Sequence, residues 1–193
     1  NNLTPGSICG TQTICEGEIP ALLSETLAGT SDFGHTYQWQ ESINGTDWAN
    51  VSSDGNNPDY APPALSQDTW YKRLITSTVD LHTCLEESNI IKVTVNNFIH
   101  GSIEENQTIC ENTPAALLTS ITPTGDGIFS YRWFRSTDGT NFGPIGGALN
   151  ETYNPGILTQ DTWYYREVKS TLNGKECVEI TNPVQITVNN LTP

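Results

Sequence analysis

Apolar and polar residues alternate along the chain in short runs, which are separated by glycine, proline, asparagine and aspartate. The clearest run is 91–95, where isoleucine and valine alternate with Lys92 and Thr94. A period of two residues places one face of a strand in a core, and no segment shows the 3.6-residue period of an amphipathic helix. The pattern therefore predicts an all-β chain with the strand and turn spacing of a two-sheet sandwich.

Aromatic residues at alternate positions predict further strands. Residues 37–40 and 131–134 each carry a Tyr-x-Trp sequence, followed by the Asn-Gly or Asp-Gly pair that is typical of a hairpin turn. We expect the tryptophan of each pair in the core. Longer strands are predicted over 69–75 and 162–168, and the Leu-x-x-Asp-x-x-Tyr spacing that ends at Tyr71 resembles the tyrosine corner of immunoglobulin sandwiches.

The sequence is a tandem repeat. Matching segments stand 95 residues apart early in the repeat and 93 apart late in it, so the small deletions fall in loops between them. The matches include 12–16 with 107–111, 67–71 with 160–164, and 93–97 with 186–190. This spacing predicts two tandem immunoglobulin-like β-sandwich domains of about 95 residues each, 1–97 and 98–193.

The end of the sequence repeats its beginning. Residues 189–193 and 1–5 both read Asn-Asn-Leu-Thr-Pro, which predicts that a further copy starts at the end of the second and that the chain is part of a longer array. Between the copies, Phe98 and Ile99 form a short apolar junction. They are expected either to pack against a neighbouring domain and stiffen the joint, or simply to start the next strand.

The composition excludes several partners. The formal net charge is −14, and an acidic surface repels nucleic-acid phosphates and anionic membrane surfaces. No run of 18 apolar residues is present, so direct membrane insertion is not expected. Charged residues make up only 16 % of the chain, whereas threonine, asparagine, serine and glycine are frequent, which is typical of extracellular β proteins.

Four of the five cysteines occupy equivalent positions in the two copies. One disulfide per copy is predicted, Cys15–Cys84 and Cys110–Cys177, each stabilising its domain by about 4 kcal/mol through loop entropy. A Cys15–Cys177 bond is the alternative, and it would lock the joint rather than a domain. Cys9 has no counterpart, so it is expected to stay free or to pair with a preceding unit. Disulfides indicate a secreted, extracellular or outer cell-surface protein.

Two further sets of residues suggest ligand binding. Asp54 and Asp59 lie in an oxygen-rich segment that loosely resembles a calcium loop, although ordinary turns explain the same residues. Tryptophans can stack on sugar rings, but they also pack at the core or its rim. The candidates for glycan binding are Trp48, Trp70 and Trp163.

Catalytic chemistry has little support in the sequence. The three histidines His35, His82 and His100 fall at different positions of the two copies. No phosphate loop, nucleophile elbow or zinc-protease motif is present. The repeated aspartates Asp68 and Asp161 are explained by a turn or a strand end. The chain is therefore not expected to be an enzyme or to need a cofactor, apart from the calcium considered above.

The repeats carry Gln-Thr-Ile-Cys-Glu, Tyr-x-Trp-x-x-Ser-x-x-Gly-Thr and Leu-x-Gln-Asp-Thr-Trp-Tyr. These strings resemble the immunoglobulin-like or PKD-like repeats of giant Bacteroidetes surface proteins, including gliding-motility adhesins of the SprB kind. The resemblance covers nearly all of both copies. It implies type IX secretion, anchoring at the outer surface, and a stalk role in adhesion or gliding motility, with neighbouring repeats as the first partners. The alternatives are a subunit of an extracellular filament, which would contact other chains, and a module that binds surface glycans.

Overall fold

The computed structural model describes residues 2–190, and within this range the chain is all-β, as predicted. None of these residues forms a helix that could span a membrane. The chain divides into two compact units, Asn1–Asn97 and Phe98–Pro193, which we call unit 1 and unit 2. Residue 1 and residues 191–193, on which the predicted start of a further copy depends, lie outside the described residues.

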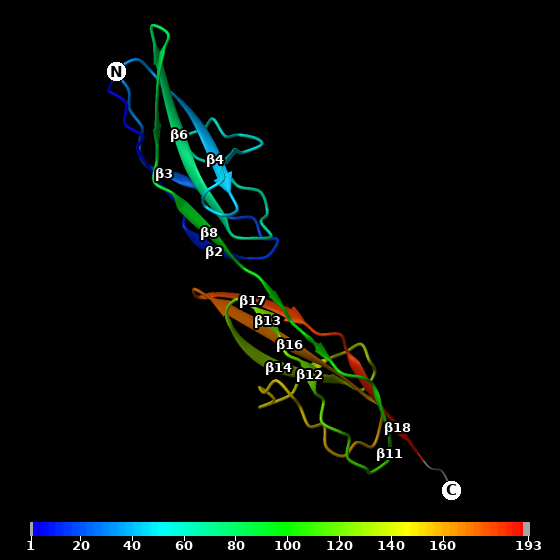
Figure 1. Cartoon of the computed structure of the whole chain (residues 1–193). Helices are drawn as coiled ribbons and strands as arrows, with labels where there is room; N and C mark the ends of the chain where they lie inside the picture. Colours follow the sequence, from blue (N-terminus) through cyan, green and yellow to red (C-terminus); the bar gives the residue numbers. More distant parts are fainter. Residues whose placement is uncertain (1, 191–193) are drawn as a thin grey trace. The chain divides into compact units, whose positions relative to one another are not determined.

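Each unit is built from strands of two to eleven residues (Figure 1). The strands of unit 1 are β1 (Ser7–Cys9), β2 (Gln12–Cys15), β3 (Ser24–Leu27), β4 (Thr36–Ser42), β5 (Ala49–Asn50), β6 (Thr69–Val79), β7 (His82–Glu87) and β8 (Ile91–Asn96). The strands of unit 2 are β9 (Phe98–Ile99), β10 (Ser102–Ile103), β11 (Gln107–Cys110), β12 (Ser120–Ile121), β13 (Thr124–Gly125), β14 (Ile128–Ser136), β15 (Gly143–Pro144), β16 (Thr162–Leu172), β17 (Lys175–Ile180) and β18 (Val184–Asn189).

The two units share one sheet topology. The larger sheet of unit 1 has the order β2-β8-β6-β4-β5, with β7 paired to β6, and unit 2 repeats it as β11-β18-β16-β14-β15, with β17 paired to β16. The pairs β2–β8 and β11–β18 are parallel, and the other pairs of these sheets are antiparallel. Small antiparallel pairs, β1–β3 in unit 1 and β10–β12 in unit 2, form the second layer.

The core of each unit lies between these layers. Ile8 of β1 and Leu23 belong to the same buried cluster as Trp39 of β4 and Val93 of β8. The prediction of a core tryptophan is confirmed in both units, because the side chains of Trp39 and Trp133 are fully buried. Each indole N–H also donates a 2.9 Å hydrogen bond to a backbone carbonyl, which satisfies its one polar atom.

The repeated aspartates hold the last strand of each sheet. Asp68 Oδ1 accepts a 2.8 Å hydrogen bond from the backbone N–H of Val95, and Asp161 Oδ1 accepts the equivalent bond from Val188. A hydrogen bond from a backbone N–H to an ionised carboxylate is stronger than one between neutral groups, so it fixes the position of the strand. The recurrence of these residues therefore has a structural explanation, as the sequence suggested.

The tyrosine-corner interpretation of Tyr71 is wrong. A tyrosine corner requires the hydroxyl to bond the backbone, whereas the Tyr71 hydroxyl is buried without a hydrogen-bond partner. The ring instead packs in the core beside Tyr60, with the ring centroids 5.8 Å apart.

The junction residues begin the first strand of unit 2. Phe98 and Ile99 form β9, which pairs antiparallel with β13. The Phe98 ring lies 5.8 Å from that of Phe129, and Phe129 stands opposite Ser170 in the register of β14 and β16. The chain therefore enters unit 2 at the end of the sheet where Ser170 lies.

Candidate functional site

One cysteine of each unit lies where the chain leaves that unit. Cys15 ends β2 and stands opposite Asn96, the last residue of β8. Cys110 ends β11 and stands opposite Asn189, the last residue of β18. We call this end of a unit its outgoing end.

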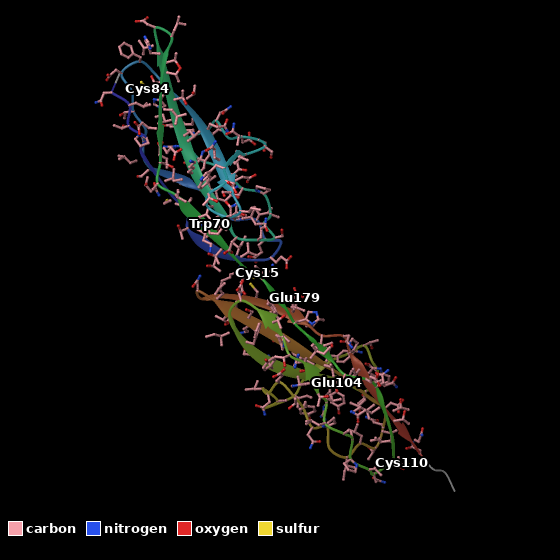
Figure 2. The ribbon with its side chains drawn as sticks, in the orientation of Figure 1. Cys15, Trp70, Cys84, Glu104, Cys110 and Glu179 are labelled. Atoms are coloured by element: carbon pink, nitrogen blue, oxygen red, sulfur yellow. The ribbon has the colours of Figure 1, made fainter. Side chains whose placement is uncertain are left out.

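The second cysteine of each unit lies at the other end of the sheet. Cys84 on β7 stands opposite Ser77 of β6, and Cys177 on β17 stands opposite Ser170 of β16. We call this the incoming end, because in unit 2 it is the end at which the chain enters. Within unit 1, Figure 2 shows Cys84 and Cys15 at opposite ends of the fold.

The predicted disulfides within each unit, Cys15–Cys84 and Cys110–Cys177, are wrong. The register separates the two cysteines of one unit by most of the length of an eleven-residue strand, about 30 Å, whereas a disulfide needs Cα atoms within about 7 Å. Cys84 and Cys110 carry free, exposed thiols, and Cys9 on β1 does too. Cys15 and Cys177 are disulfide-bonded.

A buried arginine crosses the core of unit 1, and the sequence analysis missed it. The Arg73 side chain is fully buried. Its Nη1 donates 2.7 Å bonds to Glu25 Oε2 and to the Pro58 carbonyl, and its Nη2 donates to the Pro5 carbonyl at 3.3 Å. The guanidinium also lies 4.0 Å from the centre of the Tyr37 ring. One side chain therefore links three segments that are distant in the sequence.

Unit 2 has the equivalent arginine with one different partner. Arg166 Nη1 donates to Ser120 Oγ at 2.6 Å and to the Glu151 carbonyl at 2.7 Å, and Nη2 donates to the His100 carbonyl at 3.3 Å. Burial lowers the pKa of the Arg166 guanidinium from its usual value. The available signal was the recurrence of arginine on the core face of β6 and β16, two residues after a buried tyrosine.

The candidate calcium residues occupy loop positions. Asp59 Oδ1 accepts a 2.7 Å hydrogen bond from the backbone N–H of Glu25, so this carboxylate already has a structural partner. Asp54 is exposed and has a φ of 54°, which is typical of a turn. Across residues 2–190 there is no group of three or more His, Cys, Asp or Glu side chains that could hold a metal ion.

The three candidate tryptophans are half-buried. Lys72 Nζ lies 4.7 Å from the centre of the Trp48 ring, and Lys92 Nζ lies 4.7 Å from that of Trp70. The third, Trp163, packs beside the hairpin glycine Gly139. Because lysines lie over two of the rings, those faces are partly occupied by cation–π contacts rather than open for sugar stacking.

The layer around the first short strand differs between the units. In unit 1, the Asn89 side chain accepts a hydrogen bond from the Ile8 N–H and donates one to the Ile8 carbonyl, both at 2.9 Å. In unit 2, the equivalent Asn182 lines an open groove of about 1050 Å³ between β10, β12 and the start of β18. Its lining includes the exposed Glu104, Glu105, Leu117 and Ile121.

Comparison with solved structures gives several matches at low sequence identity. A marsupial T cell receptor matches with a TM-score of 0.54 and 12 % identity, covering 93 % of this chain and 71 % of that one. Immunoglobulin domains 1–4 of Sidekick-1 match with a TM-score of 0.39 and 16 % identity, covering 97 % of this chain and 46 % of that one. Domains A168–A170 of titin match with a TM-score of 0.42 and 14 % identity, covering 97 % and 68 %. The first of these matches, whose TM-score exceeds 0.5, confirms the predicted immunoglobulin-like fold.

The search of curated protein sequences gives no match. One family model matches the chain twice, over residues 4–97 and 99–190, which together span nearly all of it. The model describes a domain of unknown function, DUF8696. The chain therefore belongs to the DUF8696 family and contains two copies of its domain.

Proposed function

We propose that this chain is a non-catalytic stalk segment of an extracellular protein, in which a Cys15–Cys177 disulfide reinforces the joint between successive immunoglobulin-like units. The position of the two bonded cysteines carries this proposal. Three of the five cysteines are free thiols, so the two disulfide-bonded cysteines are left to bond each other.

The fold of each unit, taken alone, favours this pairing. Cys15 lies at the outgoing end of unit 1, opposite Asn96 and therefore beside the last residues of that unit. Cys177 lies at the incoming end of unit 2, opposite Ser170, and this is the end at which Phe98 enters the fold. The peptide chain joins the same two ends, so a second covalent link between them needs only a short reach.

A disulfide at this place changes how the protein responds to tension. The bond would enclose residues 16–176, and a pulling force would pass from Cys15 directly to Cys177. The enclosed residues could then unfold without lengthening the chain. Such a link also restricts the unfolded chain, which stabilises the folded units by about 5 kcal/mol in the loop-entropy model. Both effects suit a protein that must hold a fixed length under load.

The location and the biological setting follow from the same chemistry. Disulfides persist in oxidising surroundings, and tandem immunoglobulin-like domains are typical of structural or adhesive surface proteins. The resemblance of the repeats to those of giant Bacteroidetes adhesins supports a finer assignment. In that assignment the chain is secreted to the outer cell surface and forms part of a stalk for adhesion or gliding motility.

Peptide mapping without reduction tests the proposal. The chain is folded in a glutathione redox buffer, free thiols are blocked, and the digest is analysed by mass spectrometry. We expect the dominant cross-link within one chain to contain Cys15 and Cys177. A dominant Cys15–Cys84 or Cys110–Cys177 pair, or five free thiols under oxidising conditions, would overturn the proposal. Cys9→Ser is the matched control and should leave the map unchanged.

A further inference from the structure

We infer that Cys110 of one copy of this chain forms a disulfide with Cys84 of a second copy. The resulting joint would be of the same kind as the one that Cys15 and Cys177 form within the chain. The inference rests on the Cys15–Cys177 pairing of the proposed function. It extends that pairing from one joint inside the chain to a rule for how successive DUF8696 units connect. The rule is that an outgoing-end cysteine bonds the incoming-end cysteine of the unit that follows.

The register makes the free cysteines equivalent to the bonded ones. Cys110 stands opposite the last residue of β18, as Cys15 stands opposite the last residue of β8, and both pairs are parallel. Cys84 stands opposite Ser77, and Cys177 stands opposite the equivalent Ser170. Cys84 and Cys110 therefore each occupy a position whose counterpart in the other unit is oxidised. This counterpart is the observation that distinguishes Cys84 and Cys110 from Cys9, which has none.

Both free thiols are accessible and have no partner within their own unit. Cys84 and Cys110 are exposed, whereas the bonded Cys177 is only 4 % exposed. Cys84 sits on β7, a strand on which all six residues are exposed. Within unit 1, Cys15 is already bonded and lies at the opposite end. The same holds for Cys177 relative to Cys110. Cys9, the other free thiol of unit 1, lies on β1, which pairs with β3 and not with the strand that carries Cys84. The partner of each of the two thiols is therefore sought in another unit.

The bond forms by thiol–disulfide exchange with a low-molecular-weight disulfide such as oxidised glutathione. The Cys110 thiolate attacks that disulfide, forming a mixed disulfide and releasing one glutathione thiolate. The Cys84 thiolate of the second copy then attacks the Cys110 sulfur, and the second glutathione leaves. Two protein thiols are oxidised to one disulfide while one glutathione disulfide is reduced to two thiols, so the electrons and protons balance.

The product is a head-to-tail assembly. Because the two halves of the joint are different, each added copy again presents a free Cys84 at one end and a free Cys110 at the other. A heterologous contact of this kind extends as an open filament unless its geometry closes a ring. The same pairing serves between neighbouring units of a longer chain, where the peptide link holds the two cysteines close.

The test uses the purified chain at rising concentration in a glutathione redox buffer. Oligomers are resolved by non-reducing electrophoresis, and their cross-linked peptides are identified by mass spectrometry. We expect a ladder of oligomers that disappears on reduction, in which Cys84–Cys110 peptides outnumber each other intermolecular pair at least tenfold. A mixture of pairs that includes Cys9 at similar frequency, or the absence of oligomers, would overturn the inference.

Three variants sharpen the result. Cys84→Ser and Cys110→Ser should each remove the oligomers, and an equal mixture of the two should restore a dimer but nothing larger. Cys9→Ser, which removes a free exposed thiol of unit 1, should leave the ladder unchanged. The same digests report the Cys15–Cys177 peptide separately. Its absence contradicts the proposed function, whereas its presence without Cys84–Cys110 contradicts only the inference of this section.

Discussion

The two units share a sheet order but differ in the side chain that accepts from their buried arginine. In unit 1, Arg73 forms a 2.7 Å ion pair with Glu25. In unit 2, the residue equivalent to Glu25 is Ser120, whose hydroxyl accepts from Arg166 at 2.6 Å. The acceptors common to both units are backbone carbonyls, one at 2.7 Å and one at 3.3 Å in each. The arginine is therefore placed by the backbone that it links. A carboxylate contacts it directly in unit 1, whereas in unit 2 the Ser120 hydroxyl stands between the two groups and donates a 3.3 Å hydrogen bond to Glu151 Oε1.

Unit 1 also has more hydrogen bonds than unit 2 around its first short strand. Asn89 of unit 1 bonds both backbone groups of Ile8, whereas the equivalent Asn182 of unit 2 borders an open groove. Unit 1 thus has two polar links, to Glu25 and through Asn89, in the places where unit 2 has a hydroxyl and a groove. We therefore expect equivalent substitutions to cost unit 1 more than unit 2.

Removal of the carboxylate should have the largest effect. Glu25→Ala leaves the buried Arg73 without its counter-charge, and the loss of one partner of a buried pair destabilises a fold by about 3 kcal/mol or more. Hydrogen exchange followed by mass spectrometry reads the two units separately. Protection should fall in unit 1 and remain unchanged in unit 2.

A second substitution at the same position supplies the hydroxyl group of unit 2, although Pro58 stands where unit 2 has Glu151. Glu25→Ser supplies a hydroxyl where Ser120 has one, so we expect it to recover more than half of the stability lost in Glu25→Ala. If Glu25→Ser were as destabilising as Glu25→Ala, a hydroxyl would not be a sufficient partner, and the comparison between the units would be wrong.

The matching loss in unit 2 should be smaller. Ser120→Ala removes one hydrogen bond to the Arg166 guanidinium, and bonds to charged groups contribute about 2 kcal/mol. Hydrogen exchange measured at increasing denaturant concentration should show destabilisation of unit 2 alone. A loss above that of Glu25→Ala would show that unit 2 depends more, not less, on this contact.

The asparagines provide a matched pair with a smaller effect. Asn89→Ala removes two hydrogen bonds to the backbone of Ile8 and should cost unit 1 about 1–2 kcal/mol. Asn182→Ala, at the equivalent exposed position of unit 2, should change stability by no more than about 0.5 kcal/mol. Equal effects of the two substitutions would remove this difference between the units.

The smallest expected effect is an alkaline loss of stability that both units share. Burial raises the pKa of Tyr71 above its usual value and raises that of Tyr164 to about 12. An unfolded tyrosine ionises near pH 10, so above that pH the unfolded chain has released protons that the folded chain keeps. The contribution of these two tyrosines to stability is thus fully present below pH 10, and it is lost as the pH rises towards about 12.

Near pH 10.5 this loss should stay below about 1 kcal/mol per tyrosine. It is measured as the fall in thermal midpoint, together with the ultraviolet absorbance of tyrosinate. Tyr164→Phe should reduce the pH dependence of unit 2 and leave that of unit 1 in place. An unchanged pH dependence in this variant would show that Tyr164 does not contribute to it.

The sequence predicted the parts of the fold that produce periodic patterns. Alternation identified the last strand of each unit, and the repeated Tyr-x-Trp identified the core tryptophans. It did not predict β7, because all six residues of that strand are exposed and no alternation exists. It also missed Arg73 and Arg166, because a charged residue within an alternating run is normally assigned to the solvent face.

The cysteine pairing could not be predicted from spacing. The interval between Cys15 and Cys84 gives the size of a loop, but it does not say at which end of a sheet each residue lies. Only the strand register places these two cysteines about 30 Å apart. The same register explains why Cys15 and Cys177, rather than the two cysteines of one unit, are the bonded residues.

Single-molecule stretching tests the reinforced joint most directly. The chain is pulled through fused tags without cysteine, first oxidised and then with a reductant. With Cys15 bonded to Cys177, only the residues outside the bond can extend, which gives about 100 Å, and reduction should release about 500 Å more. The double variant Cys15→Ser, Cys177→Ser should behave as the reduced chain does. An oxidised chain that extends to the full length without reductant would contradict the disulfide-reinforced stalk.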